Sequence, residues 1–450
     1  MRPSGAACIP PDERRTVVDV LRVLLSRQAV PPHRIELACA AVDLLLRRAI
    51  TRRADSSVFV ITGDIQAMWL RDSTAQVRPL LALEPAVPGV IDLVAGVLRT
   101  QVEGVLIDPR ANAFNREPTG AAMRRDFRDQ SPWVYERKYA VDSLCAPITL
   151  AWLLREATGS VDHVGARFRD AAATTVKLWR DEQRHERGSF VLRRRLGRRG
   201  GSLSHRGRGG PVGWTGMTWS GFRPSDDACM YGYNIPANAY AAVSLERLAT
   251  LLATAGVEEE LSREARALAE EINQGILQHG IVDDPIAGRV FAYEVDGLGN
   301  TLLIDDANVP SLLSLPYIGF CAATDPVYLA TRAWALSRGN PNWVEGETIH
   351  GIGSTHTRRG FVWPLAIAME GLTAATESDR EDALQRLEAT LSPELLFHES
   401  VDPADPRRYT RHWFSWADML YVELVLASAG LDSTCGLTGA CRPRSNARRS

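Results

Sequence analysis

The 450-residue sequence has almost no lysine and almost no net charge. Lys138 and Lys177 are its only lysines, so arginine supplies nearly all of the positive charge, a bias typical of a GC-rich genome that weakens any single arginine as a functional signal. The net charge of −2 gives no reason to expect nucleic acid or an anionic membrane as a partner. No apolar run approaches the length of a membrane span, so we expect a soluble protein.

Cysteine patterns that would cross-link the chain or bind a metal are also missing. The seven cysteines are scattered, with no CxxC pair and no Cys/His set at zinc spacing. Residues 1–15 lack the apolar segment of a signal peptide. We therefore expect a reduced, cytoplasmic protein without a metal or cofactor. The sequence leaves its oligomeric state open.

Apolar residues recur at helical spacing along most of the chain. Leu261, Ala265 and Leu268 begin one such stripe, and Asp325 is placed to cap a helix opened by Pro326. Helices are expected near residues 14–28, 31–45, 87–105, 139–157, 161–182, 236–255, 261–276, 327–336, 361–374, 378–391 and 415–429.

Other local signals are sparser. Ser378 and Glu381 have the spacing of a capping box. Strand patterns are short and few, at residues 57–62 and 289–295. About a dozen helices without a low-complexity linker predict one all-α domain over residues 1–432.

Stacked helical hairpins closing into an (α/α)6 barrel, with short strands in the loops, suit that number of helices. An α-solenoid is the alternative, but the chain lacks the internal repeat that a solenoid requires. Residues 193–210 are dense in Arg, Gly and Ser and predict a flexible surface loop. Residues 433–450 predict a disordered tail.

Several connections carry more reactive side chains than the helices they join, and such loops often carry function. The first, residues 63–73, contains Asp64, Trp69, Arg71 and Asp72. Carboxylates beside an arginine suit sugar hydroxyls, and an indole suits the face of a sugar ring. The alternative is a helix start, with Asp72 as the cap and Arg71 paired with Asp64.

The second connection, residues 133–143, places Arg137 and Lys138 beside Glu136. In a sequence with two lysines, Lys138 indicates a position that requires a compact ammonium group. A solvated charge cluster is the alternative interpretation.

The third connection, residues 218–227, contains Arg223, Asp226 and Asp227 among aromatic residues. Burial against aromatic rings raises the pKa of a carboxyl, whereas an arginine or a helix N-terminus lowers it. The adjacent aspartates can therefore differ in role. Alternatively, Ser225 or Asp226 caps the helix that follows.

A fourth region, residues 397–418, offers Glu399 as a candidate base near an aromatic cluster, with a surface salt bridge as the alternative. Residues 296–306 complete neither GxGxxG nor an EF-hand loop, which predicts turns. His350 and His356 do not have the spacing of a helical zinc pair, which favours hydrogen bonding. Together these loops suggest a carbohydrate-active enzyme with paired carboxylates, without identifying the sugar.

At these same loops the sequence resembles glycoside hydrolase family 125, whose members are metal-independent exo-α-1,6-mannosidases with an (α/α)6 fold. The similarity covers nearly the whole chain in order. The matching blocks are TGDIQAMWLRDSTAQVRPL (62–80), ERKYAVDSLC (136–145), TGMTWSGFRPSDDACMYGYNIPAN (215–238), FAYEVDGLGN through DDANVPSLLSLPY (291–317), GIGSTHT with VWPLAIAMEGLT (351–373), and HES with WFSWADMLYVELVL (398–426).

The resemblance implies an inverting mechanism with Asp226 as general acid, Asp227 as the alternative acid, and Glu399 as general base. It implies a mannose-containing oligosaccharide or glycan as the substrate. Residues 193–210 depart from the family pattern before the acid block, which bears on leaving-group specificity. The residues expected to hold the mannose are Asp64, Trp69, Arg71, Asp72, Arg137, Lys138, Arg223, Asp227 and His356.

Three alternatives stay open at this point. The chain could be another α-barrel hydrolase, including a metal-dependent α-mannosidase. It could be a carbohydrate-binding protein with a degenerate site, or a helical scaffold without a sugar site.

Overall fold

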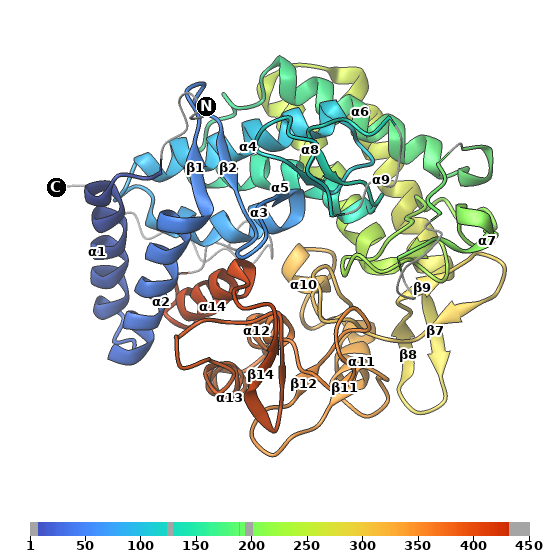
Figure 1. Ribbon diagram of the computed structural model, residues 1–450. Coiled ribbons are helices and arrows are strands. Elements are labelled where there is room, and N and C mark those ends of the chain that lie inside the picture. Colours follow the sequence, from blue (N-terminus) through green and yellow to red (C-terminus); the bar gives the residue numbers. More distant parts are fainter. Residues whose placement is uncertain (1–7, 124–128, 189, 194–200, 432–450) are drawn as a thin grey trace.

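The computed structural model describes residues 8–123, 129–188, 190–193 and 201–431 (Figure 1). Helices dominate its regular structure, as the periodicity predicts, and the all-α class is confirmed. The helices are α1 (Pro11–Arg27), α2 (Pro32–Leu44), α3 (Leu70–Val77), α4 (Gly89–Ile107), α5 (Val141–Thr158), α6 (Ala166–Glu182), α7 (Ser204–Gly207), α8 (Ile235–Ala255), α9 (Glu259–His279), α10 (Leu315–Ile318), α11 (Pro326–Ala335), α12 (Pro364–Leu372), α13 (Glu377–Glu388) and α14 (Ser415–Ser428).

Two predicted flexible segments fall wholly or partly outside the described residues. The predicted tail, residues 433–450, lies there entirely. Residues 194–200 of the predicted 193–210 loop lie there too, while the described remainder of that loop contains the short helix α7.

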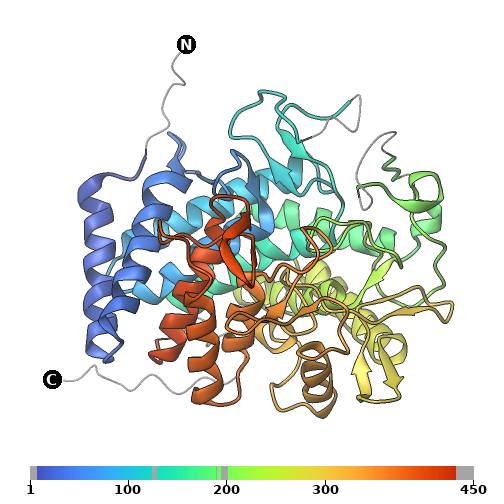
Figure 2. The ribbon, with the colours of Figure 1, turned by 60° about the horizontal axis from the view of Figure 1, so that its bottom comes forward.

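Helices consecutive in the chain pack against each other, as in α8 with α9 and α12 with α13. Further contacts join α3 to α5, α5 to α8, and α4 to α6. Helix α14 contacts α2, α3 and α12, so the last helix lies against the first part of the chain. Figures 1 and 2 show α14 in red beside α2 in blue.

One continuous apolar core runs through these helices, from Ile9 to Leu426. Its largest fully buried side chains include Trp179, Trp219 and Trp363. Burial of such large apolar surfaces is the main favourable contribution to folding. The core therefore provides a rigid support for the loops that connect the helices.

The helix ends confirm one cap prediction and correct another. The Asp325 carboxylate caps α11 and accepts a hydrogen bond from the Tyr328 amide at 2.9 Å. The capping box at Ser378 is wrong: α13 begins at Glu377, and the Thr376 hydroxyl oxygen accepts from the Asp379 amide at 3.1 Å. Thr376 adopts an extended backbone, as an N-cap requires, which leaves Ser378 inside the first turn.

Short antiparallel strands lie in the connections. Strand β2 occupies the centre of the predicted 57–62 segment, and the 289–295 segment divides into β8 and β9. The strands are β1 (Ile50–Arg52), β2 (Val58–Val60), β3 (Met68–Trp69), β4 (Ala113–Phe114), β5 (Val134–Glu136), β6 (Tyr233–Asn234), β7 (Ile281–Asp284), β8 (Gly288–Phe291), β9 (Glu294–Val295), β10 (Thr301–Leu302), β11 (Trp343–Val344), β12 (Gly351–Ile352), β13 (Ser400–Asp402) and β14 (Asp405–Thr410).

Two of these small sheets position functional loops. In the sheet β3–β4–β5, Ala113 pairs with Trp69 on one side and with Glu136 on the other, which joins the first two candidate loops. The hairpin β13–β14 places Ser400 opposite Thr410, so that Glu399 lies beside the end of β14.

Candidate active site

A cavity of about 240 Å³ lies where these loops meet. It is smaller than the ~300–1,000 Å³ of a typical ligand pocket, a size that suits one small polar ring. Its walls combine charged side chains with aromatic ones. The lining residues are Thr62, Ile65, Trp69, Arg71, Asp72, Met123, Glu136, Lys138, Pro224, Ser225, Asp226, Asn308, His356, Trp363, Glu399, Arg411 and Phe414.

The structure brings most of the predicted site residues to this cavity, although they come from five separate segments of the chain. Both predicted catalytic carboxylates, Asp226 and Glu399, line it, together with Trp69, Arg71, Asp72, Lys138 and His356. The predicted residues outside its lining are Asp64, Arg137, Arg223 and Asp227.

Arg71 is held on the cavity wall by two carboxylates. Its guanidinium donates to Asp142 at 3.1 Å and to Asp72 at 3.0 Å, while the Thr62 hydroxyl donates to the other oxygen of Asp72 at 2.7 Å. Burial lowers the pKa of Arg71, but the charges of Asp72, Asp142 and Asp226 outweigh it and raise the pKa above its ordinary value. Arg71 therefore stays a fixed cation.

The alternative interpretation of the first loop is wrong on two points. Helix α3 begins at Leu70, so Asp72 lies inside the first turn and does not cap it. Arg71 does not pair with Asp64, because Asp64 accepts instead from the guanidinium of Arg411 at 2.7 and 2.9 Å.

Arg411 is a cavity residue that sequence reasoning missed. It also donates to the carbonyl oxygen of Thr62 at 3.0 Å, and its Nη1 lies 3.9 Å from Oε1 of Glu399. Arg411 is one of three arginines between the HES block and the aromatic cluster, and its place at the end of the β13–β14 hairpin distinguishes it.

Glu399 is a buried carboxyl, with 9% of its surface exposed. Its Oε2 accepts from the Thr410 hydroxyl at 3.0 Å. Burial raises the pKa of Glu399 above its ordinary value, against the lowering effects of Arg411, His356 and Thr410. A raised carboxyl pKa suits a general base that works near neutral pH.

Asp226 lies on a tight turn and does not cap a helix. Its φ of 65° is left-handed, its amide donates to the carbonyl of Arg223 at 2.9 Å, and the Arg223 amide donates to the carbonyl of Asp227 at 2.8 Å. The predicted cap role of Ser225 or Asp226 is therefore wrong. The cap of α8 is Asn234, whose side chain accepts from the Ala237 amide at 3.0 Å.

A buried amide holds the carboxyl of Asp226. The side-chain nitrogen of Asn112 donates to Oδ1 of Asp226 at 3.0 Å and to Oε2 of Glu136 at 2.9 Å. The other oxygen of Glu136 lies 3.0 Å from Nζ of Lys138. The second loop thus supports the third through Asn112, a residue without any signal in the sequence.

Asp227 turns to the other side of the same turn. Its Oδ1 lies 3.1 Å from Nδ1 of His356, and its Oδ2 accepts from the Thr355 hydroxyl at 2.9 Å. Burial opposes both charges, but the pair lowers the pKa of Asp227 and raises that of His356. This contact confirms the expected hydrogen-bonding role of His356.

The other two predicted residues lie farther out. Arg137 pairs with Asp108, and Arg223 pairs with the buried Glu294. Glu294 also accepts from the Met230 amide at 2.9 Å, which fixes the segment after the turn that contains Asp226.

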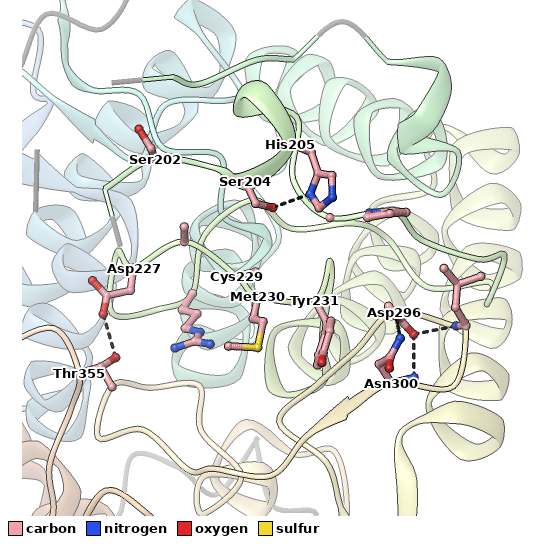
Figure 3. Close-up of a pocket in the computed structure, with 15 residues that line it drawn as sticks. Ser202, Ser204, His205, Asp227, Cys229, Met230, Tyr231, Asp296, Asn300 and Thr355 are labelled. Atoms are coloured by element: carbon pink, nitrogen blue, oxygen red, sulfur yellow. Dashed lines mark hydrogen bonds between the residues drawn. The ribbon is translucent and has the colours of Figure 1, made fainter. Parts of the chain in front are cut away.

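A second, wider cavity of about 710 Å³ adjoins the turn that contains Asp226 and is lined by Arg223 and Asp227, among others (Figure 3). Figure 3 shows Asp227 and Thr355 on one side of it, with Asp296 and Asn300 on the other. Asp296 accepts from the Leu298 and Asn300 amides at 2.7 and 3.1 Å, which confirms the predicted turn. Asp227 lines this wider cavity, and its partner His356 lines the narrower one.

The described residues contain no group of three or more His, Cys, Asp or Glu side chains placed to hold a metal ion. Within the same part of the chain, no helix has the length and apolar character needed to cross a membrane.

A small polar cavity lined by carboxyls, in a helix-rich fold, is typical of a glycoside hydrolase. Comparison with known proteins specifies the class further. The chain belongs to the family of metal-independent alpha-mannosidases, GH125, which it matches over residues 36–426.

Individual relatives agree with this assignment. The chain is 36% identical over 405 residues to the meiotically up-regulated gene 157 protein of Schizosaccharomyces pombe, covering 86% of this chain and 79% of that one. It is 38% identical to a solved metal-independent alpha mannosidase from Streptococcus pneumoniae, in a non-productive complex with alpha-1,6-mannobiose. The TM-score is 0.90, over 94% of this chain and 99% of that one.

A more distant likeness concerns the fold alone. A bacterial glucoamylase complexed with acarbose has a TM-score of 0.55 at 14% identity, over 82% of this chain and 50% of that one.

Proposed function

We propose that the protein is an inverting exo-α-mannosidase that releases terminal mannose from α-1,6-linked manno-oligosaccharides or glycans. One observation carries the proposal: Asp226 and Glu399, which are 173 positions apart in the sequence, line the same cavity of about 240 Å³. The relative that was solved with α-1,6-mannobiose supports the linkage.

In this mechanism the protonated Asp226 donates to the departing glycosidic oxygen. Glu399 accepts a proton from a water molecule, which attacks the anomeric carbon from the opposite face. One bond forms as the other breaks, so the product is initially β-mannose. The two carboxyls of such an enzyme lie roughly 6.5–9.5 Å apart, which leaves room for the water.

The cavity walls suit the hydroxyls of one mannose. Asp72 can accept hydrogen bonds, and Arg71 and Lys138 can donate them, from positions already fixed by ion pairs. Trp69 offers an indole face. Asp64 contributes to the site by holding Arg411 in an ion pair. The guanidinium of Arg137 is paired with Asp108, so contact between Arg137 and the mannose stays a prediction.

We also propose that the helices form an (α/α)6 barrel. The contacts α12–α14, α14–α3, α3–α5, α5–α8 and α8–α10 give five of the six junctions of an inner ring. The ring would close between α10 and α12. Helices α2, α4, α6, α9, α11 and α13 would form the outer layer.

The test replaces each proposed catalytic carboxyl by its amide. Asp226→Asn and Glu399→Gln should each lower kcat on α-1,6-mannobiose by at least ~100-fold, because general acid–base catalysis contributes ~10²–10⁴-fold. The matched control is Glu394→Gln, an exposed glutamate five positions before Glu399, and it should stay near wild type.

Proton NMR of the product gives a second test, because initial β-mannose indicates inversion. Initial α-mannose would contradict the mechanism. Tight binding of mannobiose without turnover would instead favour a carbohydrate-binding protein. Activity lost in EDTA and restored by a divalent cation would favour a metal-dependent enzyme.

A further inference from the structure

We infer that Asn112 is a positioning residue that fixes which oxygen of Asp226 donates the proton. The inference rests on the proposed function, in which Asp226 is the acid. Asn112 lies between α4 and β4 and is fully buried. Its backbone is anchored on both sides: its amide donates to the carbonyl of Glu136, and its carbonyl accepts from the Leu70 amide, both at 3.2 Å.

The orientation of the Asn112 side chain follows from its surroundings. Oxygen and nitrogen of an amide are assigned from the groups that face them. One end faces the backbone N–H of Lys138 at 3.0 Å, which can only donate, so this end is Oδ1. The nitrogen therefore faces the two carboxyls, Glu136 at 2.9 Å and Asp226 at 3.0 Å.

This orientation has a consequence for the acid. The two N–H groups of the Asn112 amide donate hydrogen bonds to two carboxyl oxygens, so the side chain has no further N–H group to donate. Oδ1 of Asp226 accepts a hydrogen bond from one of these N–H groups. A proton on Oδ1 would therefore point at the Asn112 N–H, which is itself a donor. The proton therefore occupies Oδ2. Asn112 thus reserves Oδ2 of Asp226 for transfer to the glycosidic oxygen.

The turn of Asp226 needs such support. Its φ of 65° is a left-handed conformation, which is strained in a non-glycine residue. The backbone bonds of the turn fix the peptide, but they leave the rotation of the carboxyl free. The hydrogen bond from Asn112 sets that rotation. The Glu136–Lys138 ion pair in turn fixes the carboxylate that accepts from the other N–H of the Asn112 amide.

The test uses two substrates that differ in their need for an acid. Hydrolysis of α-1,6-mannobiose requires protonation of the departing sugar. Hydrolysis of 2,4-dinitrophenyl α-mannoside does not, because dinitrophenolate leaves unprotonated. Asn112→Leu, of similar size but without donors, should lower kcat on mannobiose by ~30-fold or more and on the dinitrophenyl substrate by less than ~3-fold, a part of the ~10²–10⁴-fold acid contribution. Equal losses on both substrates, or no loss, would overturn the inference.

The matched control is Asn115→Leu. Asn115 is a buried asparagine of the same segment, and its side chain donates to the carbonyls of Ala121 and Pro132, with no carboxyl among these partners. It should affect both substrates equally. If Asn112→Leu fails to fold, Asn112→Ala provides the same comparison, because alanine also lacks the N–H donors.

Asp226→Ala separates this inference from the proposed function. It should lose mannobiose activity while keeping the dinitrophenyl activity within ~10-fold. If Asp226→Ala lowers both activities equally, the acid assignment itself fails. If Asp226→Ala discriminates between the substrates and Asn112→Leu does not, only the role of Asn112 fails. In the double variant, loss of Asn112 should add nothing to the loss on mannobiose, because the two residues act as one unit.

Discussion

The hydroxyl of Thr410 donates to the Glu399 carboxylate at 3.0 Å and so stabilises its charged form. This bond lowers the pKa of Glu399, which burial raises. Thr410→Val should therefore raise the pKa further, and a general base must be deprotonated to act. We expect the acid limb of kcat/KM against pH to move to higher pH, with the plateau within ~3-fold of wild type.

The control for this experiment is Thr250→Val, a half-buried threonine of α8 whose hydroxyl donates to the Glu246 carbonyl at 2.9 Å. It should leave the acid limb in place. An acid limb that is unchanged in Thr410→Val would show that a different group limits activity at low pH.

Residues that carry charge within a distinctive block were predictable. Asp226, Glu399 and His356 could be named because each lies in a loop with a strong pattern. Asn112 and Arg411 could not, because their roles come from partners 114 and 347 positions away. Pairing at that distance depends on how the helices assemble, and spacing along the chain does not record it.

Helix α9 shows how an element supports the acid block. Gly275 of α9 packs against residues 215–217, the beginning of the segment that leads to the acid turn. A Cβ at this position would lie 2.4 Å from the Thr215 carbonyl oxygen and 2.9 Å from the Met217 side chain. Replacing a glycine by alanine inside a helix usually stabilises the helix by about 1 kcal/mol. Overpacking of the kind expected at Gly275 costs about 1–3 kcal/mol.

We therefore expect Gly275→Ala to lower the free energy of unfolding by about 1–2 kcal/mol, measured by urea denaturation. The control is Gln274→Ala, the exposed neighbour on the same helix, which should change stability by less than ~0.5 kcal/mol. A Gly275→Ala variant more stable than wild type would contradict the close packing.

The long amphipathic helices were predicted to within a few residues, since their apolar stripes face a continuous core. Helix α3 was predicted only in the alternative interpretation of the first loop, as a helix start. Its buried residues include Arg71, Asp72, Ser73, Thr74 and Gln76, so apolar periodicity cannot detect it. A helix that buries polar side chains at a site resembles a loop in the sequence.

The two cavities give the whole molecule an asymmetric binding region. The narrow one suits a terminal mannose, and we propose that the wider one receives the remaining sugars of the glycan. Part of its wall comes from residues 202–211, in the segment that departs from the family pattern. Tyr231 on this wall offers a ring face for a sugar.

Tyr231→Ala should raise KM for a linear α-1,6-mannotriose by ~5- to 10-fold, about 1 kcal/mol of binding. The effect should decrease for mannobiose. Leu277→Ala, an exposed position on α9, is the control. Equal KM changes for both oligosaccharides would place the longer substrate elsewhere.

The contact of α14 with α2 and α3 also has a consequence for synthesis of the protein. The buried faces of α2 and α3 emerge from the ribosome early, but their partner begins at Ser415. Glu399 and Arg411 also come from this late part of the chain. The protein therefore cannot assemble the site of its proposed base during most of translation, and the apolar face of α2 has no α14 to pack against until the end of synthesis.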